Sequence, residues 1–348
     1  MTAVFDMSQF SIISQGHSAF QLLWAGVKLG LYDELSISPG ISLDEVSARL
    51  SISHYPSKVL LVGLTALGVI EKRNDAYFNS DLTERLLVSG RPDSFVPILA
   101  WQAHIVYPGL QDLVESLRTG TNVGLSRFPG DGLNLYQRLA NHPNLERIFQ
   151  DAMASLSRQA NSNLVTSYDF SRFSHIIDVG GGDATNAINI ALHYPHLRIT
   201  VFDSPSVCKT ATHNVHSAGL DHRICVRAGD LWADSFPSGV DAVLFCHMLT
   251  IWSMKQNLEL LKKCHDALTP DGSVIVFNMM ASDDLSGPII TALGSPYFIA
   301  IATGQGMLHT WADYEKAIFD AGFGHVKRVE GWPFDHGVIV GTKCPQSQ

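Results

Sequence analysis

Three consecutive glycines, Gly180 to Gly182, follow a short apolar run and constrain the fold of this chain more than any other feature. The run before them, residues 176–179, reads Ile-Ile-Asp-Val and is typical of a buried parallel strand. Glycine lets the backbone turn sharply and leaves room for a ligand, because it has no Cβ. A segment able to form a helix begins at Ala184, and a second apolar run, 197–202, ends at Asp203. This order predicts a βαβ nucleotide-binding unit.

The acidic residue at the end of the second strand narrows the choice of nucleotide. Asp203 lies 21 positions after Gly182, and a carboxylate there can accept hydrogen bonds from both ribose hydroxyls. Nicotinamide enzymes share this spacing but place a third glycine against the pyrophosphate, where this chain has Thr185. The substitution favours S-adenosylmethionine, a nucleoside cofactor without phosphates. The competing explanation is an ordinary αβ connection, which Asp178 and Asp203 together make less favourable.

Composition limits the partners. With 348 residues, 46% hydrophobic and 16% charged, the chain is globular and long enough for two domains. A formal net charge of −9 disfavours nucleic acid and anionic membrane, so a small-molecule substrate is expected. The five cysteines form no Cys-x-x-Cys pair, and the sequence shows neither an export signal nor a membrane-length apolar run. These features predict a soluble, cytoplasmic protein without a disulfide framework.

The N-terminal half reads as a winged-helix pattern. Apolar residues recur at helical spacing over 10–35, with breaks expected near Gly16 or Gly30, and Ser42 begins a capping box. A further helix is followed by two short strands within 69–79. A DNA-reading helix would be basic on its outer face, but the position of that helix, 58–67, is apolar. A dimer interface or a lid over another domain is therefore favoured over DNA binding, and a homodimer is expected.

The C-terminal half alternates strands and helices beyond Asp203, which predicts a doubly wound parallel sheet with an antiparallel edge formed by the last strands. A helical region without glycine or proline, 144–171, joins the halves. The expected fold class is α/β, with a mainly helical N-terminal domain and a Rossmann-like C-terminal domain. The predicted boundary gives residues 1–170 as the winged-helix-like dimerisation and substrate-lid domain and residues 171–348 as the cofactor-binding domain.

Four motifs in order carry a family resemblance over nearly the whole chain. They are the Asp-Val-Gly-Gly-Gly run at 178–182, Val-Phe-Asp-Ser-Pro at 201–205, Ala-Gly-Asp-Leu at 228–231, and Trp252. The chain resembles the S-adenosylmethionine-dependent methyltransferases of the winged-helix, small-molecule O-methyltransferase type. That resemblance implies a methyltransferase with S-adenosylmethionine as its cofactor.

The resemblance also implies roles for cofactor-binding residues. Asp178 belongs to the glycine motif, Gly180 and Gly182 face the methionine part of the cofactor, and Asp203 faces the ribose. Asp230 and Leu231 face the adenine, Cys246 occupies a position where the family often has a lysine, and Ser157 touches the methionine carboxylate.

The chain departs from the family at its catalytic pair. In the O-methyltransferases a His-Asp pair directly precedes the tryptophan, but this chain has Thr250 and Ile251, and the supporting glutamate is replaced by Leu308. Neither Thr nor Ile is a useful base at neutral pH. The segments 278–280, 292–298 and 303–309 instead resemble the α-keto acid C-methyltransferases, including those that act on 5-guanidino-2-oxopentanoate. Methylation of the β-carbon of an α-keto acid is therefore expected, in a pathway to an antibiotic or a modified amino acid.

Carbon methylation of a keto acid requires enolisation, with a base at the β-proton and a polarising partner at the keto oxygen. His247 and His309 are the predicted catalytic residues, although most of the 15 histidines are expected to be structural. A divalent metal held by two histidines is a weaker hypothesis, because no carboxylate lies at ligand spacing. Two competing hypotheses for the function are O-methylation of a hydroxylated aromatic molecule and a cofactor-binding relative that does not methylate.

The residues predicted to bind the substrate come from several segments of the chain: His104, Trp252, Asn278, Tyr297 and Thr303. The pair Asp283 and Asp284 is a candidate contact for a cationic substrate side chain, with loop solubility as the commoner explanation. The identity of the substrate side chain is not encoded in any motif.

Overall fold

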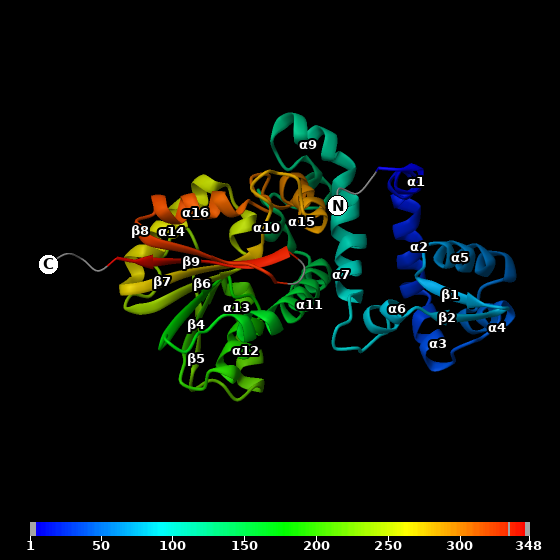
Figure 1. Cartoon of the computed structure of the whole chain (residues 1–348), viewed down its shortest axis with the longest axis horizontal. Coiled ribbons are helices and arrows are strands. Elements are labelled where there is room, and N and C mark those ends of the chain that lie inside the picture. The colour runs from blue at the N-terminus through cyan, green and yellow to red at the C-terminus, as the bar shows by residue number, and fades with distance from the viewer. Residues whose placement is uncertain (1–4, 333–334, 345–348) are drawn as a thin grey trace. The chain divides into compact units, whose positions relative to one another are not determined.

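The structure, a computed structural model, describes residues 5–332 and 335–344 (Figure 1). The chain divides into two compact units, Met1–Ala103 and His104–Gln348. This division precedes the boundary near residue 170 that the sequence suggested. The reason is the long helix α11 (Pro143–Ser167), which packs against α12 (Thr185–His193) of the second unit instead of forming a separate connector.

The N-terminal unit contains helices and one hairpin, as the sequence predicted. Gly16 begins the second helix, and Gly30, at φ 75°, separates the second from the third. The capping box of Ser42 with Glu45 is present at the start of α4. The elements are α1 (Met7–Ser14), α2 (Gly16–Lys28), α3 (Leu31–Ile37), α4 (Leu43–Leu50), α5 (His54–Ala66), β1 (Ile70–Arg73), β2 (Ala76–Asn79), α6 (Asp81–Leu86) and α7 (Val96–Trp101).

Helix α5 shows how this unit distributes its apolar residues. Leu61 and Leu64 are buried in the core of the unit. On the other side of the helix, Tyr55, Val59 and Val62 are 76%, 51% and 59% exposed. Spacings of four and three residues place these side chains on one helical face.

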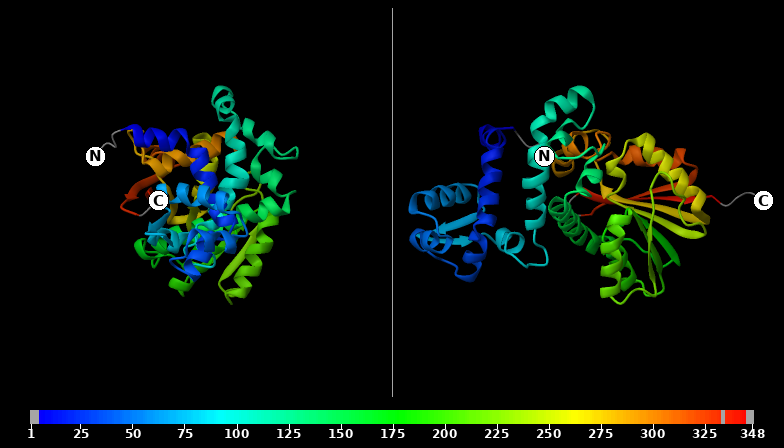
Figure 2. Two further views of the ribbon diagram at one scale, coloured as in Figure 1. Left: turned by 90° about the vertical axis from the view of Figure 1, so that its right-hand side faces the viewer. Right: turned by 180° about the vertical axis from the view of Figure 1, so that it is seen from behind.

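The C-terminal unit is built on a seven-stranded sheet with the order β5-β4-β3-β6-β7-β9-β8. Figure 2 shows this sheet in two further views. The first five strands pair in parallel, and β9 and β8 add the predicted antiparallel edge. The strands are β3 (His175–Val179), β4 (Arg198–Asp203), β5 (Ile224–Ala228), β6 (Val240–Cys246), β7 (Leu268–Met279), β8 (Phe323–Val329) and β9 (His336–Lys343).

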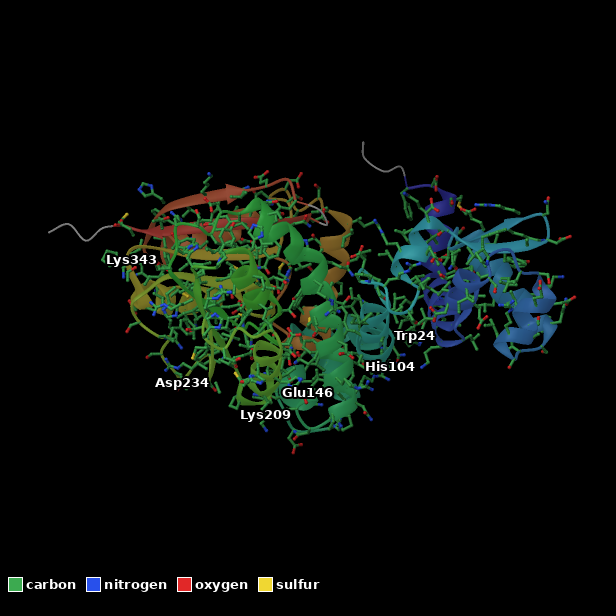
Figure 3. All side chains as sticks on the ribbon, turned by 90° about the horizontal axis from the view of Figure 1, so that it is seen from below. Trp24, His104, Glu146, Lys209, Asp234 and Lys343 are labelled. Carbon is green, nitrogen blue, oxygen red and sulfur yellow. The ribbon has the colours of Figure 1, made fainter. Side chains whose placement is uncertain are left out.

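Helices cover both faces of this sheet, and side chains fill the space between (Figure 3). Ile176 and Leu244 pack toward α11, α12 and α13, whereas Ile177 and Phe245 pack toward α14 and α16. Side chains alternate along a strand, so Asp178 lies on the same face as Ile176. The other helices are α8 (Tyr107–Gly109), α9 (Leu113–Thr119), α10 (Leu135–Leu139), α13 (Pro205–Ser217), α14 (Met254–Ala267), α15 (Ile289–Tyr297) and α16 (Trp311–Asp320), with short helices η2 (Leu110–Asp112), η3 (Val123–Arg127) and η4 (Leu249–Ile251).

Two π-helices interrupt the α-helices of the chain. Apolar residues at helical spacing in 92–118 are typical of an amphipathic helix, but the π-helix η1 (Gln102–Val106) follows α7, and α8 ends with Pro108 and Gly109. A second π-helix, η5 (Phe298–Ala302), follows α15. The side chain of Ile301 lies where a Cβ on Gly109 would stand, so α8 and η5 are in close contact. Single π-turns of this kind are frequent at functional sites.

Among the described residues no helix combines the length and apolar composition that a membrane span requires. All five cysteines are free thiols.

Candidate active site

The glycine loop after β3 is the centre of the predicted cofactor site. Gly180 and Gly182 have φ values of 71° and 59°, which favour glycine, and the Gly180 N–H donates to the Phe202 carbonyl at 2.9 Å. A Cβ on Gly180 would stand 2.7 Å from Cγ of Met248, whereas nothing lies within 4 Å of the corresponding position on Gly182. The loop is thus packed tightly on one side and open to a ligand at Gly182.

Asp203, at the end of β4, is fixed against this loop. Its Oδ2 accepts from the Gly182 N–H at 2.9 Å, and its Oδ1 accepts from the Ser204 N–H at 2.7 Å. Burial raises the pKa of Asp203, and these two hydrogen bonds oppose the increase. Each oxygen keeps a further lone pair, so the carboxylate can still accept hydrogen bonds from two hydroxyl groups.

Asp178 is the most unusual acid of the site. Its side chain is fully buried, and neither carboxyl oxygen has a hydrogen-bond partner among the described residues. Burial raises its pKa to about 7, and the carboxylates of Asp203 and Asp183 add to the increase. Cys246, at the end of the adjacent strand β6, is 7% exposed, and burial and the nearby Asp178 raise its thiol pKa.

Asp230 shapes the turn after β5. Its Oδ1 accepts from the N–H groups of Ala233 at 2.9 Å and Trp232 at 2.7 Å, and these bonds lower its pKa. Lys263 donates to the Leu231 carbonyl at 2.6 Å and fixes the next residue of the turn. The indole of Trp232, 39% exposed, lies perpendicular to that of Trp252 with ring centroids 5.0 Å apart. An aromatic wall therefore adjoins the predicted adenine position.

Thr250 and Ile251 occupy the positions of the His-Asp pair of the O-methyltransferases, and the structure closes this place to a substrate. Thr250 is 2% exposed, and its hydroxyl donates to the His247 carbonyl at 3.0 Å. A Cβ on Gly306 would overlap the carbonyl oxygen of Thr250 and the backbone of Ile251. Since Thr250 is buried, hydrogen-bonded and covered by backbone, it is not available to take a proton from a substrate.

Residues 303–309, which we call the clamp loop, hold the short helix η4 in place. The Thr303 hydroxyl donates to the Ile251 carbonyl. A ring nitrogen of His309, Nε2, lies 3.1 Å from the Trp252 carbonyl oxygen, and His309 is only 4% exposed. Burial lowers the pKa of His309, while the Trp252 bond and Asp313 oppose that decrease. These contacts favour a structural role for Thr303 and His309.

His247, by contrast, has a ring nitrogen that no described residue engages in a hydrogen bond. It adopts φ 55°, and its Nε2 is buried with no hydrogen-bond partner among the described residues. The ring lies 5.0 Å from that of His336 and 5.2 Å from that of Phe277, centroid to centroid. Burial, with a smaller contribution from His336, lowers the pKa of His247 to about 3. The imidazole is therefore neutral at physiological pH and is a weak base in the cofactor-free chain.

The comparisons with known proteins identify the family. Residues 109–324 match the family model of the O-methyltransferase domain. The chain belongs to this family. It is 37% identical to the L-tyrosine C(3)-methyltransferase of Streptomyces lavendulae over 98% of this chain and 94% of that one. It is 33% identical to the 3-hydroxy-5-methyl-1-naphthoate 3-O-methyltransferase of Streptomyces sahachiroi, over 93% and 92% of the two chains.

Solved structures of methyltransferases also match this chain. The apo form of the S-adenosylmethionine-dependent methyltransferase SibL has a TM-score of 0.84 and 40% identity, and covers 97% of this chain and 100% of that one. Human N-acetylserotonin methyltransferase in complex with S-adenosylmethionine has a TM-score of 0.86 at 24% identity over 99% and 100%, which supports the fold. This family member is an S-adenosylmethionine-dependent methyltransferase. Its site fits that cofactor, because it combines an open glycine loop, an acid at a strand end, and a buried acid without a hydrogen-bond partner in the described part of the chain.

The other predicted substrate residues lie in several environments. Asn278 is fully buried and donates to the Tyr314 hydroxyl at 3.1 Å, on the side of the sheet covered by α16. Tyr297 is 5% exposed and hydrogen-bonded to Tyr136. His104 is exposed on the π-helix η1. The structure brings Trp252, Thr303 and His309 together at η4. It does not bring Asn278 to His247. The His247 ring lies against Phe277, and Asn278, the next residue of β7, faces the opposite side of the sheet.

Ser157, half-buried in α11, lies on the helix that covers the cofactor face of the sheet. Among the described residues no group of three or more His, Cys, Asp or Glu side chains could hold a metal ion.

The structure corrects the suggested role of Asp283. Its Oδ2 accepts from Arg328 at 2.8 Å, and its Oδ1 accepts from the Ala312 N–H at 2.8 Å. The Asp284 carboxylate accepts from the Ser286 N–H and hydroxyl. Both acids are thus engaged within the chain, and Asp283 already has a cationic partner.

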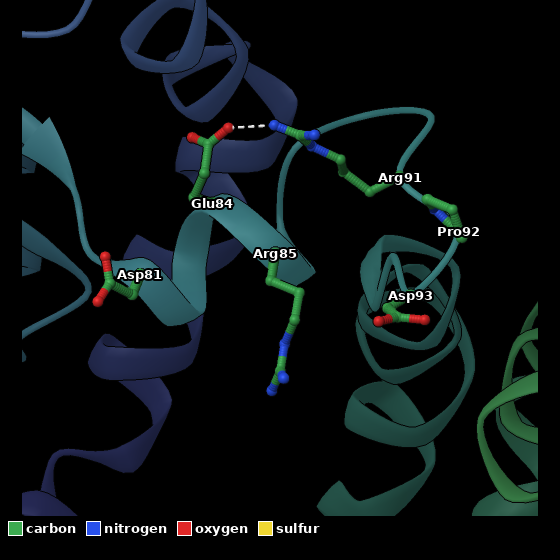
Figure 4. Close-up of a pocket in the computed structure, with 6 residues that line it drawn as sticks. All are labelled: Asp81, Glu84, Arg85, Arg91, Pro92 and Asp93. Carbon is green, nitrogen blue, oxygen red and sulfur yellow. Dashed lines mark hydrogen bonds and ion pairs between the residues drawn. The ribbon is translucent and has the colours of Figure 1, made fainter.

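Sequence reasoning missed two aromatic neighbours of the site, His336 and Trp232. His336 stands on the last strand, far from His247 in sequence, and no local motif signals the contact. Trp232 directly follows the Asp230-Leu231 motif, so its position alone could have suggested it. A polar surface pocket in the N-terminal unit includes none of the predicted site residues. It is lined by Asp81, Glu84, Arg85, Arg91, Pro92 and Asp93, with an ion pair between Arg91 and Glu84 (Figure 4).

Proposed function

We propose that this enzyme methylates carbon, at the ring position next to the hydroxyl group of a phenolic amino acid or a close derivative. The observation that carries the proposal is the closed base position, where Thr250 is buried under Gly306 and bonded to the His247 carbonyl. The relationship to an L-tyrosine C(3)-methyltransferase over 98% of the chain supports a phenol as the acceptor.

A phenol is a stable enol, so its ring carbon can act as the nucleophile once the hydroxyl proton is removed. Bound S-adenosylmethionine supplies an electrophilic methyl group. In the proposal, the neutral imidazole of His247 takes the hydroxyl proton, which turns the adjacent ring carbon into a nucleophile. The phenolate stabilises the imidazolium beside it, which offsets the low pKa of the free ring. After the carbon–methyl bond forms, His247 returns its proton to the oxygen, and the proton of the methylated ring carbon passes to water.

Cofactor binding falls to the residues around the glycine loop. Gly180 and Gly182 leave room for the methionine part, and the Asp203 carboxylate, held by Gly182 and Ser204, accepts the ribose hydroxyls. The turn at Asp230 and Leu231 receives the adenine, next to the indole of Trp232. Ser157 reaches the methionine carboxylate from α11.

Methylation of the β-carbon of an α-keto acid is the second candidate, because an enol needs the same proton acceptor and likewise does not use the missing His-Asp pair. Asp283 was the expected partner of a guanidino side chain on that keto acid, but its carboxylate already binds Arg328. O-methylation is the third candidate, supported by the naphthoate 3-O-methyltransferase among the relatives.

The decisive experiment incubates the enzyme with 13C-methyl-labelled S-adenosylmethionine and a panel of acceptors, followed by NMR of the products. We expect L-tyrosine, or another phenolic amino acid in the panel, to gain a methyl group on the ring carbon next to its hydroxyl. Tyrosine deuterated at both such carbons should lose one deuterium, and O-methyltyrosine, which has no hydroxyl proton, should not react. Label on a phenolic oxygen, or label gained only by the α-keto acids of the panel, would contradict the proposal.

We further propose a homodimer formed through the N-terminal unit. Tyr55, Val59 and Val62 form a continuous exposed apolar face on α5, whereas exposed apolar residues on monomers are commonly isolated from one another. Light scattering should give twice the chain mass at micromolar concentration, and V59E/V62E should give a smaller species. A monomeric wild-type chain would reject the dimer.

A further inference from the structure

The carboxyl group of Asp178 is enclosed on every side that the structure describes. It is 0% exposed, and neither oxygen has a hydrogen-bond partner among the described residues. A Cβ on Gly181 would stand 2.8 Å from its Oδ2. Removing a carboxylate from water without a compensating partner is costly, so such a group takes the neutral, protonated form. Its pKa of about 7 agrees with this form in the cofactor-free chain.

Among the described residues, the charged groups that shift the pKa of Asp178 are both acidic. From β4 comes Asp203 and from the glycine loop comes Asp183, and both carboxylates disfavour a negative charge on Asp178. From β6 comes Cys246, whose thiol is buried and neutral, since burial and Asp178 raise its pKa. By the family resemblance, position 246 often carries a lysine. This chain therefore places three acids and a neutral thiol around a site for a cationic cofactor.

We propose that Asp178 gives up its carboxyl proton when the positively charged methionine end of S-adenosylmethionine binds, so that each cofactor bound releases one proton, and that the neutral Cys246 makes this exchange necessary. The α-ammonium and sulfonium groups supply the positive charge that the protein lacks. The inference rests on the proposed cofactor site and is independent of which acceptor atom is methylated.

Linkage gives the sign of the effect. Below pH 7 the free enzyme holds the proton and the complex does not, so the dissociation constant for S-adenosylmethionine should rise about tenfold for each unit of pH lowered. The range from pH 5.5 to 7 keeps an α-amino group charged, so the cofactor itself does not titrate strongly there.

The test is calorimetry of the full chain with S-adenosylmethionine at pH 6, in two buffers with different heats of ionisation. The difference in apparent enthalpy should correspond to nearly one proton released, and to about half a proton at pH 7. Asp178→Asn should abolish the release and make affinity independent of pH in this range. Cys246→Lys should also abolish it, because a neighbouring ammonium removes the proton beforehand, whereas the neutral Cys246→Ser should keep it.

The outcomes distinguish proton release from cofactor binding itself. A wild-type chain that binds S-adenosylmethionine without releasing a proton at pH 6 overturns this inference and leaves the proposed function intact. Proton release that persists unchanged in Asp178→Asn assigns the proton to another group and also overturns this inference. If Asp178→Asn does not bind the cofactor, unchanged release in Cys246→Lys has the same meaning. A chain with no affinity for S-adenosylmethionine at any pH overturns both.

Discussion

The α-carbon of Gly306 packs directly against the carbonyl oxygen of Thr250, with no space for a Cβ between them. Gly306→Ala should therefore displace η4, lowering the free energy of unfolding by about 1–3 kcal/mol and reducing methyl transfer. Thermal melting and a labelled-methyl assay would measure both effects. Gly16→Ala is the matched control, because nothing lies within 4 Å of a Cβ there. Equal behaviour of the two variants would show that the contact is unimportant.

Thr250→Val tests whether Thr250 takes part in proton transfer. Valine keeps the shape but loses the 3.0 Å hydrogen bond to the His247 carbonyl. We expect a stability loss of about 1 kcal/mol, with activity kept within a few-fold, because the hydroxyl has no chemical role. If the variant instead folds normally and loses all methyl transfer, Thr250 belongs to the catalytic group after all.

His247→Asn should lower kcat by about two to three orders of magnitude, the range typical of a lost general base. The dissociation constant for S-adenosylmethionine should stay the same. His336→Asn should have a smaller effect on kcat and should shift the acid limb of the pH profile upward, because His336 helps to lower the His247 pKa. Single-turnover rates as a function of pH measure both changes. Wild-type rates in His247→Asn would remove this residue from the mechanism.

Asp178→Asn should make the cofactor-free chain more stable at alkaline pH. The folded pKa of about 7 exceeds the ordinary value of 3.8, so the stability contributed by the bound proton is complete below pH 3.8 and lost as the pH rises through 7. Asparagine stays neutral, which predicts a gain of up to about 4 kcal/mol above pH 8 that vanishes near pH 4. Denaturant titrations at both pH values would test this, with the exposed Asp75→Asn as a control.

Asp203→Asn should weaken S-adenosylmethionine binding by roughly ten- to a hundredfold, as expected when hydrogen bonds to a charged group are lost. The substitution preserves size and one acceptor oxygen, so it perturbs the Gly182 and Ser204 contacts less than alanine would. Calorimetry gives the dissociation constant, with the exposed Asp221→Asn as the comparison. An unchanged constant would place the ribose elsewhere.

Local signals in the sequence predicted most of the fold. The glycine run, the capping box at Ser42, the hairpin within 69–79 and the alternation after Asp203 each depend on residues close together in the chain, and the structure confirms them. The break at η1 was not predicted, because a π-turn has no distinct residue pattern and the apolar spacing on either side continues.

Contacts between distant segments could not be predicted. The clamp loop reaches η4 across about fifty residues, and the ring of His336 meets that of His247 from β9, two strands away from β6 in the sheet. The sequence predicted catalytic roles for His247 and His309, but only the fold shows how the two rings differ. A ring nitrogen of His309 is bonded to the Trp252 carbonyl, whereas His247 has a buried nitrogen without a hydrogen-bond partner among the described residues.

Arg328 competes with any cationic ligand for the Asp283 carboxylate in the loop after β7. Its guanidinium contacts Asp283 at 2.8 Å and holds both oxygens of Glu315 at 2.6 Å. A tethered group of this kind acts at an effective concentration in the millimolar range or above, so a free arginine-like molecule would have to displace a ligand that never diffuses away. A variant that selects a cationic acceptor at Asp283 must therefore first replace Arg328 by a residue without a positive charge.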